Sequence, residues 1–364
     1  MHSISNLLES YILLAIGIFI AYPISITFWN LFAHKFFCQD RFEIQNIHQS
    51  NVDIPRFGGL MIILTLVSFN ITHQPPIELS LINNLIIFSL PMILVAISED
   101  FFYNISPFMR LLFSFLSIIL FFIFFDFSYP VIEIPFMHDI LNNSEMKYVL
   151  FTLSLVALIN GMNVIDGANG LAPMTALASL IALGYLAYLN SDYEITLTTL
   201  IIAFSIIVML IFNYPWGKIF LGDTGAYFLG WCIGLLVIIF YGRNDQLPTW
   251  SACLLIFYPS IEIIFSFCRK LCSGNSPFRS DNNHLHLRIY FILEKKINNK
   301  LLANNLLMPL LFIIWMLPPI VCVFIFNDLY LIIISLISFT ALYFLIYGLT
   351  FINFSKDIIK NKYN

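Results

Sequence analysis

Long apolar runs separated by short polar segments dominate this chain. A membrane-spanning helix needs about 20 consecutive, mostly apolar residues, and such runs predict about ten or eleven spans. We expect them at approximately residues 8–30, 57–73, 82–98, 107–127, 147–162, 169–189, 195–212, 219–241, 249–271, 304–326 and 329–352. The chain is therefore predicted to be an all-α, polytopic membrane protein in which residues 1–364 form a single integral membrane domain.

The composition agrees with that pattern. Hydrophobic residues make up 60% of the 364 residues and charged residues only 10%, whereas roughly a quarter of the residues of a soluble domain are charged. The formal net charge is -4, and the Lys and Arg residues form no basic stripe along the sequence. No nucleic-acid partner is therefore expected. The first apolar run lacks a basic segment before it and a small-residue cleavage site after it, so we interpret it as a retained span.

The basic residues predict an orientation, because cytoplasmic connections carry an excess of Lys and Arg. With the N-terminus outside, only Lys147 and Arg243 of the 17 basic residues fall in outside connections. We therefore predict a multi-pass protein of the cytoplasmic (inner) membrane with its N-terminus outside. The inside loops are expected at approximately residues 31–56, 99–107, 163–168, 213–218 and 272–303.

Acidic, amide and other polar side chains at the ends of membrane spans are candidates for function, since they are costly in an apolar setting. Here they form four groups, and all four map to the predicted cytoplasmic side. The groups are Glu99 with Asp100; Asn160, Asn163, Asp166 and Asn169; Asn213 with Asp223; and Arg279, His284 and His286.

Four carboxylates in these groups, those of Glu99, Asp100, Asp166 and Asp223, would repel one another at one membrane face unless a cation neutralised them. Hard oxygen ligands suit Mg²⁺ or Mn²⁺, and such ions commonly bridge phosphate oxygens. Arg and His donors nearby would hold a further phosphate group. The sequence therefore predicts chemistry on a phosphorylated substrate at the cytoplasmic surface.

Each group also has an ordinary structural explanation. The acidic pair has the composition of a solvated loop after a helix, and Asp166-Gly and Asn169-Gly are good turn formers. Asp223 stands where an N-cap residue would offer its oxygen to free backbone N–H groups. The two histidines are compatible with a solvated loop. Glu262, within the ninth predicted span, has no assigned role, because the sequence does not decide between a cavity and a neighbouring helix.

Five motifs follow one another in order between about Asp40 and Arg288. They are His48 to Pro55-Arg56-Phe-Gly58-Gly59-Leu60; Glu99-Asp100 with Arg110; Asn160-x-x-Asn163-x-x-Asp166-Gly-x-Asn169-Gly-Leu171; Phe220-x-Gly222-Asp223-x-Gly225; and Asn283-His284-Leu-His286-Leu. Together they resemble the motifs of the polyprenyl-phosphate N-acetylhexosamine-1-phosphate transferases of glycosyltransferase family 4. That family includes enzymes that start O-antigen, enterobacterial common antigen and teichoic acid synthesis.

The resemblance implies a reaction in which a polyprenyl (undecaprenyl) phosphate attacks the β-phosphate of a UDP-N-acetylamino sugar and UMP leaves. It also implies site residues. Asp223 and Asp166 would bind Mg²⁺ (or Mn²⁺), and Glu99 and Asp100 would take a proton from the lipid phosphate or position it, with Asp166 as a third catalytic group. The implied substrate-binding residues are Asn160, Asn163, Asn169, Asn213, Arg279, His284 and His286.

Two departures refine the resemblance. Many members of the family carry Asp-Asp where this chain has Glu99-Asp100, which preserves the charge with a longer reach. The loop around His284 and His286 resembles the polysaccharide-initiating members more than the phospho-N-acetylmuramoyl-pentapeptide transferases of peptidoglycan synthesis, which are the alternative within the family.

A secondary transporter is the alternative from another class, because buried acids in a helix bundle also form ion paths. The oligomeric state stays open, a homodimer included.

Overall fold

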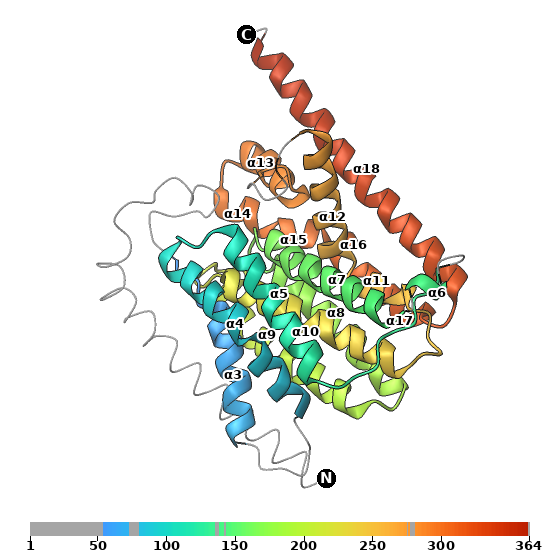
Figure 1. Cartoon of the computed structure of the whole chain (residues 1–364). Coiled ribbons are helices and arrows are strands. Elements are labelled where there is room, and N and C mark those ends of the chain that lie inside the picture. The colour runs from blue at the N-terminus through green and yellow to red at the C-terminus, as the bar shows by residue number, and fades with distance from the viewer. Residues whose placement is uncertain are drawn as a thin grey trace.

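The computed structural model describes residues 54–72, 80–134, 138–141, 143–274, 276 and 281–362, and every regular element within those ranges is a helix. The predicted span at 8–30, the first-motif residue His48 and the candidate Arg279 lie outside the described residues. With the labels of Figure 1, the helices are α3 Gly58–Thr72, α4 Ser80–Phe102, α5 Pro107–Phe124, α6 His138–Leu141, α7 Ser144–Ile165, α8 Leu171–Leu189, α9 Tyr193–Asn213, α10 Gly222–Arg243, α11 Trp250–Leu255, α12 Phe257–Cys272, α13 Leu285–Ile297, α14 Lys300–Asn305, α15 Leu307–Leu310, α16 Phe312–Trp315, α17 Leu317–Ile325 and α18 Leu329–Lys362.

Seven of the described helices are long and apolar enough to cross a membrane, namely α4, α5, α7, α8, α9, α10 and α18. An eighth span results if Lys300–Leu310 and Phe312–Ile325, which meet at 42°, count as one. Helix α3 is apolar but shorter. The prediction of an all-helical, multi-pass membrane protein is confirmed. The total of ten or eleven spans stays a prediction, since the first lies outside the described residues.

The predicted span 249–271 is divided into α11 and α12 at Ile256. Pro259 has no N–H to donate to the carbonyl four residues earlier, and that carbonyl, of Leu255, accepts a hydrogen bond from Ser179 Oγ of α8 at 2.6 Å instead. A neighbouring helix thus satisfies the backbone group that the proline frees, as an apolar surrounding requires.

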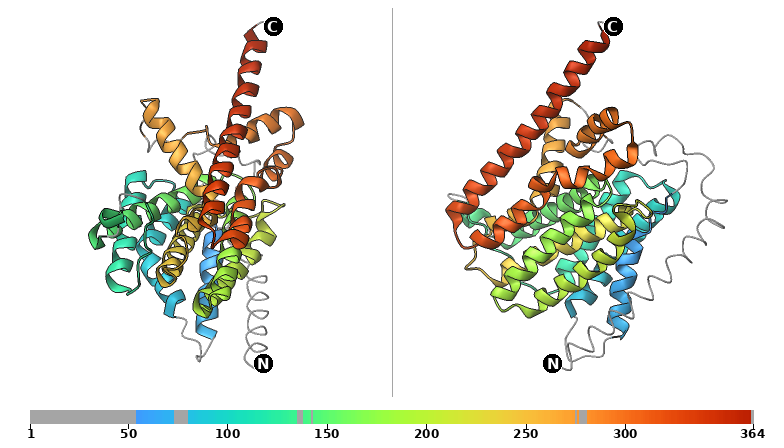
Figure 2. Two further views of the ribbon diagram at one scale, coloured as in Figure 1. Left: turned by 90° about the vertical axis from the view of Figure 1, so that its right-hand side faces the viewer. Right: turned by 180° about the vertical axis from the view of Figure 1, so that it is seen from behind.

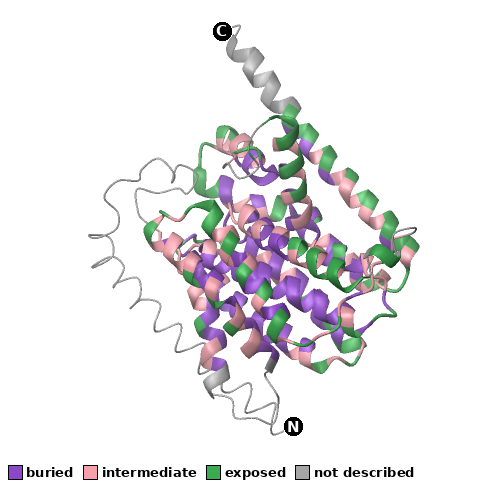
Figure 3. Ribbon diagram, viewed as in Figure 1, coloured by how far each residue is buried: buried purple, intermediate pink, exposed green. Residues whose placement is uncertain are grey.

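Helix α10 is the centre of the bundle. It packs on α3, α4, α7 and α8, and 94% of its most apolar window is buried. Figure 3 shows buried residues concentrated along this central part of the bundle. Because its N-terminal end carries the Gly222-Asp223 motif, the most deeply enclosed helix also fixes the position of the candidate site.

The segment before α3 is joined to the segment before α10 by backbone hydrogen bonds. Phe220 N–H donates to Pro55 O at 3.0 Å, and Gly58 N–H donates to Phe220 O at 2.9 Å. Gly59 and Gly225 allow this approach, since a Cβ on Gly59 would lie 2.1 Å from the Gly225 nitrogen. This junction places Arg56 beside the start of α10.

Helix α18 runs along the outside of the bundle, and its C-terminal end extends beyond it (Figures 1 and 2). Only 11% of its apolar window is buried, as expected for a lipid-facing helix. It contacts α11, α13 and α17. Helix α13 lies within residues 272–303, the segment predicted as a cytoplasmic loop, and its buried side chains include Leu285, Leu287 and Tyr290. The side of the membrane that this segment faces stays a prediction.

Candidate active site

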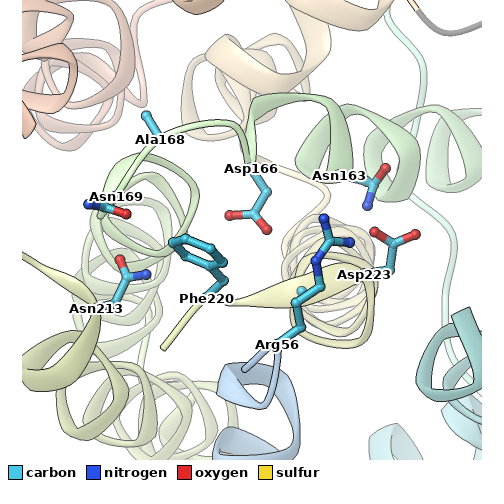
Figure 4. Close-up of a pocket in the computed structure, with 9 residues that line it drawn as sticks. Arg56, Asn163, Asp166, Ala168, Asn169, Asn213, Phe220 and Asp223 are labelled. Atoms are coloured by element: carbon cyan, nitrogen blue, oxygen red, sulfur yellow. The ribbon is translucent and has the colours of Figure 1, made fainter. Parts of the chain in front are cut away.

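A small cavity of about 90 Å³ lies where the ends of several helices meet. Its lining combines charged, amide and aromatic side chains from segments far apart in the sequence (Figure 4). The lining residues are Arg56, Asn163, Asp166, Ala168, Asn169, Asn213, Phe220, Gly222 and Asp223. Five candidates from the sequence, namely Asn163, Asp166, Asn169, Asn213 and Asp223, are therefore brought together around one space.

Asp166 caps the C-terminal end of α7 and stands in the cavity wall. Its carboxylate accepts a hydrogen bond from the backbone N–H of Gly222 at the start of α10. Desolvation by the surrounding protein, together with the negative charges of Asp223 and Asp100, raises the pKa of Asp166 to about 8, and Arg56 opposes that rise. The acidic cluster thus favours either a bound proton or a nearby positive charge.

The positive charges beside these acids come from two arginines. Figure 4 shows the guanidinium of Arg56 directed into the cavity toward Asp166 and Asp223, and it interacts electrostatically with both. Arg110 of α5 donates a hydrogen bond from Nη1 to Asp223 Oδ2. Asp223 is therefore held in one orientation while 13% of its side chain stays accessible.

Asp100 holds the N-terminal end of α10. Its Oδ1 accepts a hydrogen bond from Asp223 N–H at 2.9 Å. Its Oδ2 accepts from the N–H and the hydroxyl of Thr224 at 2.9 Å and 2.7 Å. The free N–H groups at the start of a helix usually need such an acceptor, and here it comes from another helix rather than from Asp223 itself. Asp100, which is 5% exposed, thereby fixes the backbone that carries Asp223.

Gly222 is needed where α10 begins. Its φ of +76° favours glycine, and an added Cβ would lie 2.8 Å from Asp100 Oδ2 and 2.9 Å from the Arg56 carbonyl oxygen. We expect Gly222→Ala to lower the free energy of unfolding by about 2 kcal/mol and activity by roughly tenfold, measured by thermal unfolding and turnover in parallel. Gly274→Ala is the matched control, because Gly274 has a φ of +68° with nothing within 4 Å. Equal losses in the two variants would contradict a role for the contact with Asp100.

Glu99 does not belong to the described cavity lining, although it interacts electrostatically with Arg110, the partner of Asp223. Its Oε2 accepts a hydrogen bond from Ile105 N–H at 2.8 Å, which ties the short connection between α4 and α5 to the last turn of α4. Glu99 therefore orders the segment that leads to Arg110. Its predicted catalytic role stays a prediction.

Hydrogen-bonded asparagine side chains form the wall of the cavity across from Asp223 (Figure 4). Asn213 Oδ1 accepts from Gly170 N–H at 2.6 Å, and its Nδ2 donates to Ile219 O at 2.8 Å. Asn169 donates its backbone N–H to Asn304 Oδ1 at 2.8 Å and its Nδ2 to Asn305 Oδ1 at 3.0 Å. The side-chain oxygen of Asn169 is thereby oriented independently of any ligand.

Asn160 lies one helical turn before Asn163 and does not belong to the described cavity lining. Its Nδ2 donates to Val156 O of the same helix at 2.8 Å. The predicted substrate-binding role of Asn160 therefore has no direct contact with the cavity to support it, and it stays a prediction.

His284 and His286 are buried, with exposed fractions of 7% and 1%, and neither belongs to the described cavity lining. A solvated-loop explanation of these histidines is therefore wrong. Their rings stack with centroids 6.0 Å apart. His286 packs on Gly167, since a Cβ there would lie 2.3 Å from His286 Nε2. His286 thus lies against the residue that follows Asp166, and His284 stacks on His286. A direct contact of either histidine with substrate stays a prediction.

Sequence reasoning missed several residues of this site. In the sequence Arg56 stands out only as part of a motif, although its position just before an apolar run is a further signal. Phe220 likewise lines the cavity. Asn304 and Asn305 gave no signal, because they stand more than 130 residues from Asn169 and belong to no motif.

The fit to a divalent cation can be judged from the donor set. Among the described residues, no three Asp, Glu, His or Cys side chains come close enough to hold a metal by themselves. However, Mg²⁺ is commonly held by one or two carboxylates together with substrate phosphates and water. Asp166 and Asp223, with the Asn163 amide beside them (Figure 4), fit that mode of binding.

Comparison with known proteins gives one family and a consistent set of relatives. Residues 82–241 match the model of glycosyl transferase family 4. The undecaprenyl-phosphate alpha-N-acetylglucosaminyl 1-phosphate transferase of Thermotoga maritima is 28% identical over 71% of this chain and 74% of its own length. A probable undecaprenyl-phosphate N-acetylglucosaminyl 1-phosphate transferase of Bacillus subtilis is 28% identical over 43% of this chain and 44% of its own length.

A phospho-N-acetylmuramoyl-pentapeptide-transferase of Streptococcus pneumoniae is 26% identical over 66% of this chain and 76% of its own length. The matched residues 82–241 contain Asp166 and Asp223, which line the cavity, and Asp100, which accepts a hydrogen bond from Asp223 N–H. The resemblance seen in the motifs is confirmed: residues 82–241 match glycosyl transferase family 4, and the chain is similar to proteins named as sugar-1-phosphate transferases.

Proposed function

We propose that this protein transfers an N-acetylamino-sugar 1-phosphate, with N-acetylglucosamine as the first candidate sugar, from a UDP-sugar to a polyprenyl (undecaprenyl) phosphate in the membrane. UMP is released, and the product starts a cell-envelope polysaccharide. The observation that carries this proposal is the cavity where Arg56, Asp166 and Asp223 meet at the ends of α7 and α10. The names of the relatives from Thermotoga and Bacillus support the same reaction.

The chain's own residues suit a nucleotide diphosphate. Arg56 offers a planar guanidinium that binds phosphate oxygens through paired N–H groups. The ring of Phe220 and the fixed oxygen of Asn169 offer a flat face and an acceptor for a base. A cavity of about 90 Å³ is smaller than typical ligand pockets of roughly 300–1,000 Å³. It therefore takes one part of the donor, and the sugar and the lipid phosphate meet at its mouth.

The reaction exchanges one phosphoanhydride bond for another and keeps the ester bond between the β-phosphate and the sugar. An oxygen of the lipid phosphate forms a bond with the β-phosphorus, the bond from that phosphorus to the bridging oxygen breaks, and UMP leaves with the bridging oxygen. Mg²⁺ held by Asp166 and Asp223 would supply charge neutralisation for the diphosphate and the leaving UMP. Arg56 and Arg110 contribute fixed positive charge at the same place.

The acidic pair needs no strong basicity in this scheme, because a phosphate monoester with a second pKa near about 6 is mostly ionised at neutral pH. Asp100 has both oxygens engaged at the start of α10. We therefore assign it the task of positioning Asp223. Glu99 orders the neighbouring connection through Ile105.

We place the site on the cytoplasmic side of the inner membrane. Asp166 ends α7 and Asp223 begins α10, whereas Lys147 and Arg243 stand near the opposite ends of the same two helices. A helix of 22 residues is about 33 Å long, close to the thickness of the bilayer core. The two basic residues predicted to be outside thus lie one membrane thickness from the acids. Site groups at helix ends also favour surface chemistry over a transport path at the bilayer midplane.

The proposed function is tested by nucleotide release from the purified full chain in detergent, given undecaprenyl phosphate, Mg²⁺ and a panel of UDP-N-acetylamino sugars. We expect one sugar to support UMP release and a chelator to abolish it. Release of UDP in place of UMP would indicate ordinary glycosyl transfer. Absence of release with every donor, UDP-N-acetylmuramoyl-pentapeptide included, would overturn the proposal.

Metal binding is expected to depend on pH through Asp166. Its pKa of about 8 means that the carboxyl carries a proton at neutral pH in the metal-free protein, and a bound cation must displace that proton. The affinity for Mg²⁺ or Mn²⁺ should therefore rise about tenfold per pH unit between roughly pH 6 and 8, and then level off. Titration calorimetry measures both affinity and released protons. Asp166→Asn should remove the slope, and an affinity independent of pH in the unmodified protein would contradict this prediction.

A further inference from the structure

Glu262 of α12 is a buried carboxylate outside the cavity, with 1% of its surface exposed. Its Oε1 lies 3.1 Å from His284 Nδ1 and accepts a hydrogen bond from Leu285 N–H at 3.1 Å. Its Oε2 accepts a hydrogen bond from the hydroxyl of Tyr343 in α18 at 3.0 Å. One side chain thus joins α12, the first turn of α13 and the peripheral helix α18.

Because Glu262 is a buried carboxylate, this junction requires all of its hydrogen-bond partners. A carboxylate removed from water is strongly disfavoured unless it is paired and fully hydrogen-bonded. His284 is the basic group in contact with it, and Tyr343 and Leu285 supply the further donors. Loss of one partner would leave a buried charge with fewer donors, which is costly.

The junction reaches the cavity through the two stacked histidines. The ring of His284 lies parallel to that of His286, with an angle of 12° between the planes. His286 in turn packs directly on Gly167, the residue that follows Asp166. Contacts therefore connect Glu262, through His284 and His286, to the turn that carries Asp166.

We propose that Glu262 is a positioning residue for the donor site: acting through His284 and His286 it holds the turn of residues 166–170 in place, and Tyr343 links this support to α18. The proposal rests on the proposed function for its effect on turnover. It also gives the lipid-facing helix α18 a task, since Tyr347 of the same helix donates a hydrogen bond to Asn283 O at 3.0 Å in the histidine segment.

The test compares Glu262→Gln, Glu262→Asp and Tyr343→Phe in the full chain. Tyr258→Phe is the matched control, because Tyr258 is equally buried in α12 and its hydroxyl has no hydrogen-bond partner among the described residues. We measure KM for the UDP-sugar separately from kcat. Partial unfolding lowers the apparent kcat and leaves KM unchanged, whereas a loosened donor turn raises KM.

We expect KM to rise about tenfold in Glu262→Gln and about threefold in Tyr343→Phe. Glu262→Asp should recover part of the loss, and Tyr258→Phe should stay within twofold. If Glu262→Gln does not fold, the KM of Tyr343→Phe for the UDP-sugar decides whether the positioning role holds. Unchanged KM in the folded variants would overturn the proposal.

Hydrogen exchange separates this proposal from the proposed function. Amides of residues 166–170 should exchange faster in Glu262→Gln and Tyr343→Phe than in the unmodified protein, while those of α5 should not change. This comparison needs no turnover, so it supports or overturns the positioning role even if the unmodified protein releases no UMP. Unchanged exchange in the turn would overturn it.

Discussion

Replacing Asp223 by asparagine is expected to reduce kcat for UMP release by about 10²–10⁴-fold, the largest effect of any single substitution in this protein. Asp223 lines the cavity, begins the most buried helix and is oriented by Arg110. Asparagine keeps the shape of the side chain but removes its negative charge. The substitution therefore weakens cation binding and leaves the charge of Arg110 without its carboxylate partner.

A matched control for this prediction is Asp192→Asn. Asp192 also accepts hydrogen bonds from an arginine, Arg243, with both oxygens 3.1 Å from Nη1, but it caps α9 at the end of the bundle away from the cavity. We expect near-normal turnover in that variant, because exposed ion pairs contribute little. Full turnover in Asp223→Asn would refute the assignment of the active site.

The sequence predicted the convergence of Asp166, Asn169 and Asp223 because each stands at the end of an apolar run. The ends of helices that cross the same membrane must lie at one of two faces, so hydrophobic pattern and charge bias together placed these groups near one another. The family motifs implied which residues form the site, but of those the described cavity lining includes Asn163, Asp166, Asn169, Asn213 and Asp223 and not Asn160, His284 or His286. The fold class followed from the same pattern.

The sequence did not predict how the site is held together. Asp100 reaches the start of α10 across 124 residues, and Asn304 reaches Asn169 across 135. Such partners depend on helix packing, which hydrophobic periodicity does not specify. Glu262 illustrates the same point, since a lone acid in an apolar run predicts a functional or buried partner without saying that the partner is a histidine on the next helix.

The acceptor for the N–H groups at the start of α10 is Asp100 and not Asp223, and this changes the role expected for Asp100 in the Glu99-Asp100 pair. An N-cap made by Asp223 itself would have directed its carboxylate to its own helix and away from the cavity. Because Asp100 supplies that acceptor instead, Asp223 is free to face Arg110 and the cavity. Asp100 is thus engaged at the start of α10, and the carboxylate of Asp223 is left available to the cavity, as the proposed function requires.

Asp100→Asn is therefore expected to act on stability and turnover together. The amide supplies one oxygen acceptor where the carboxylate supplies two, and its NH₂ group must face the N–H of Asp223 or of Thr224. We expect the free energy of unfolding to fall by about 2–4 kcal/mol, because hydrogen bonds to a buried charged group are lost. Turnover should fall by roughly 10–100-fold, because the start of α10 no longer fixes Asp223.

Thr224→Val separates this positioning role from a direct catalytic one. It removes the hydroxyl that donates to Asp100 at 2.7 Å and leaves the carboxylate in place. If Asp100 positions Asp223, Thr224→Val should reproduce part of both losses, about threefold in turnover. If Asp100 instead takes a proton from the substrate, that variant should keep its turnover, and Asp100→Asn should lose activity while its unfolding midpoint stays that of the unmodified protein. Thermal unfolding and UMP release measured on the same preparations decide between them, because only a positioning residue ties the two losses together.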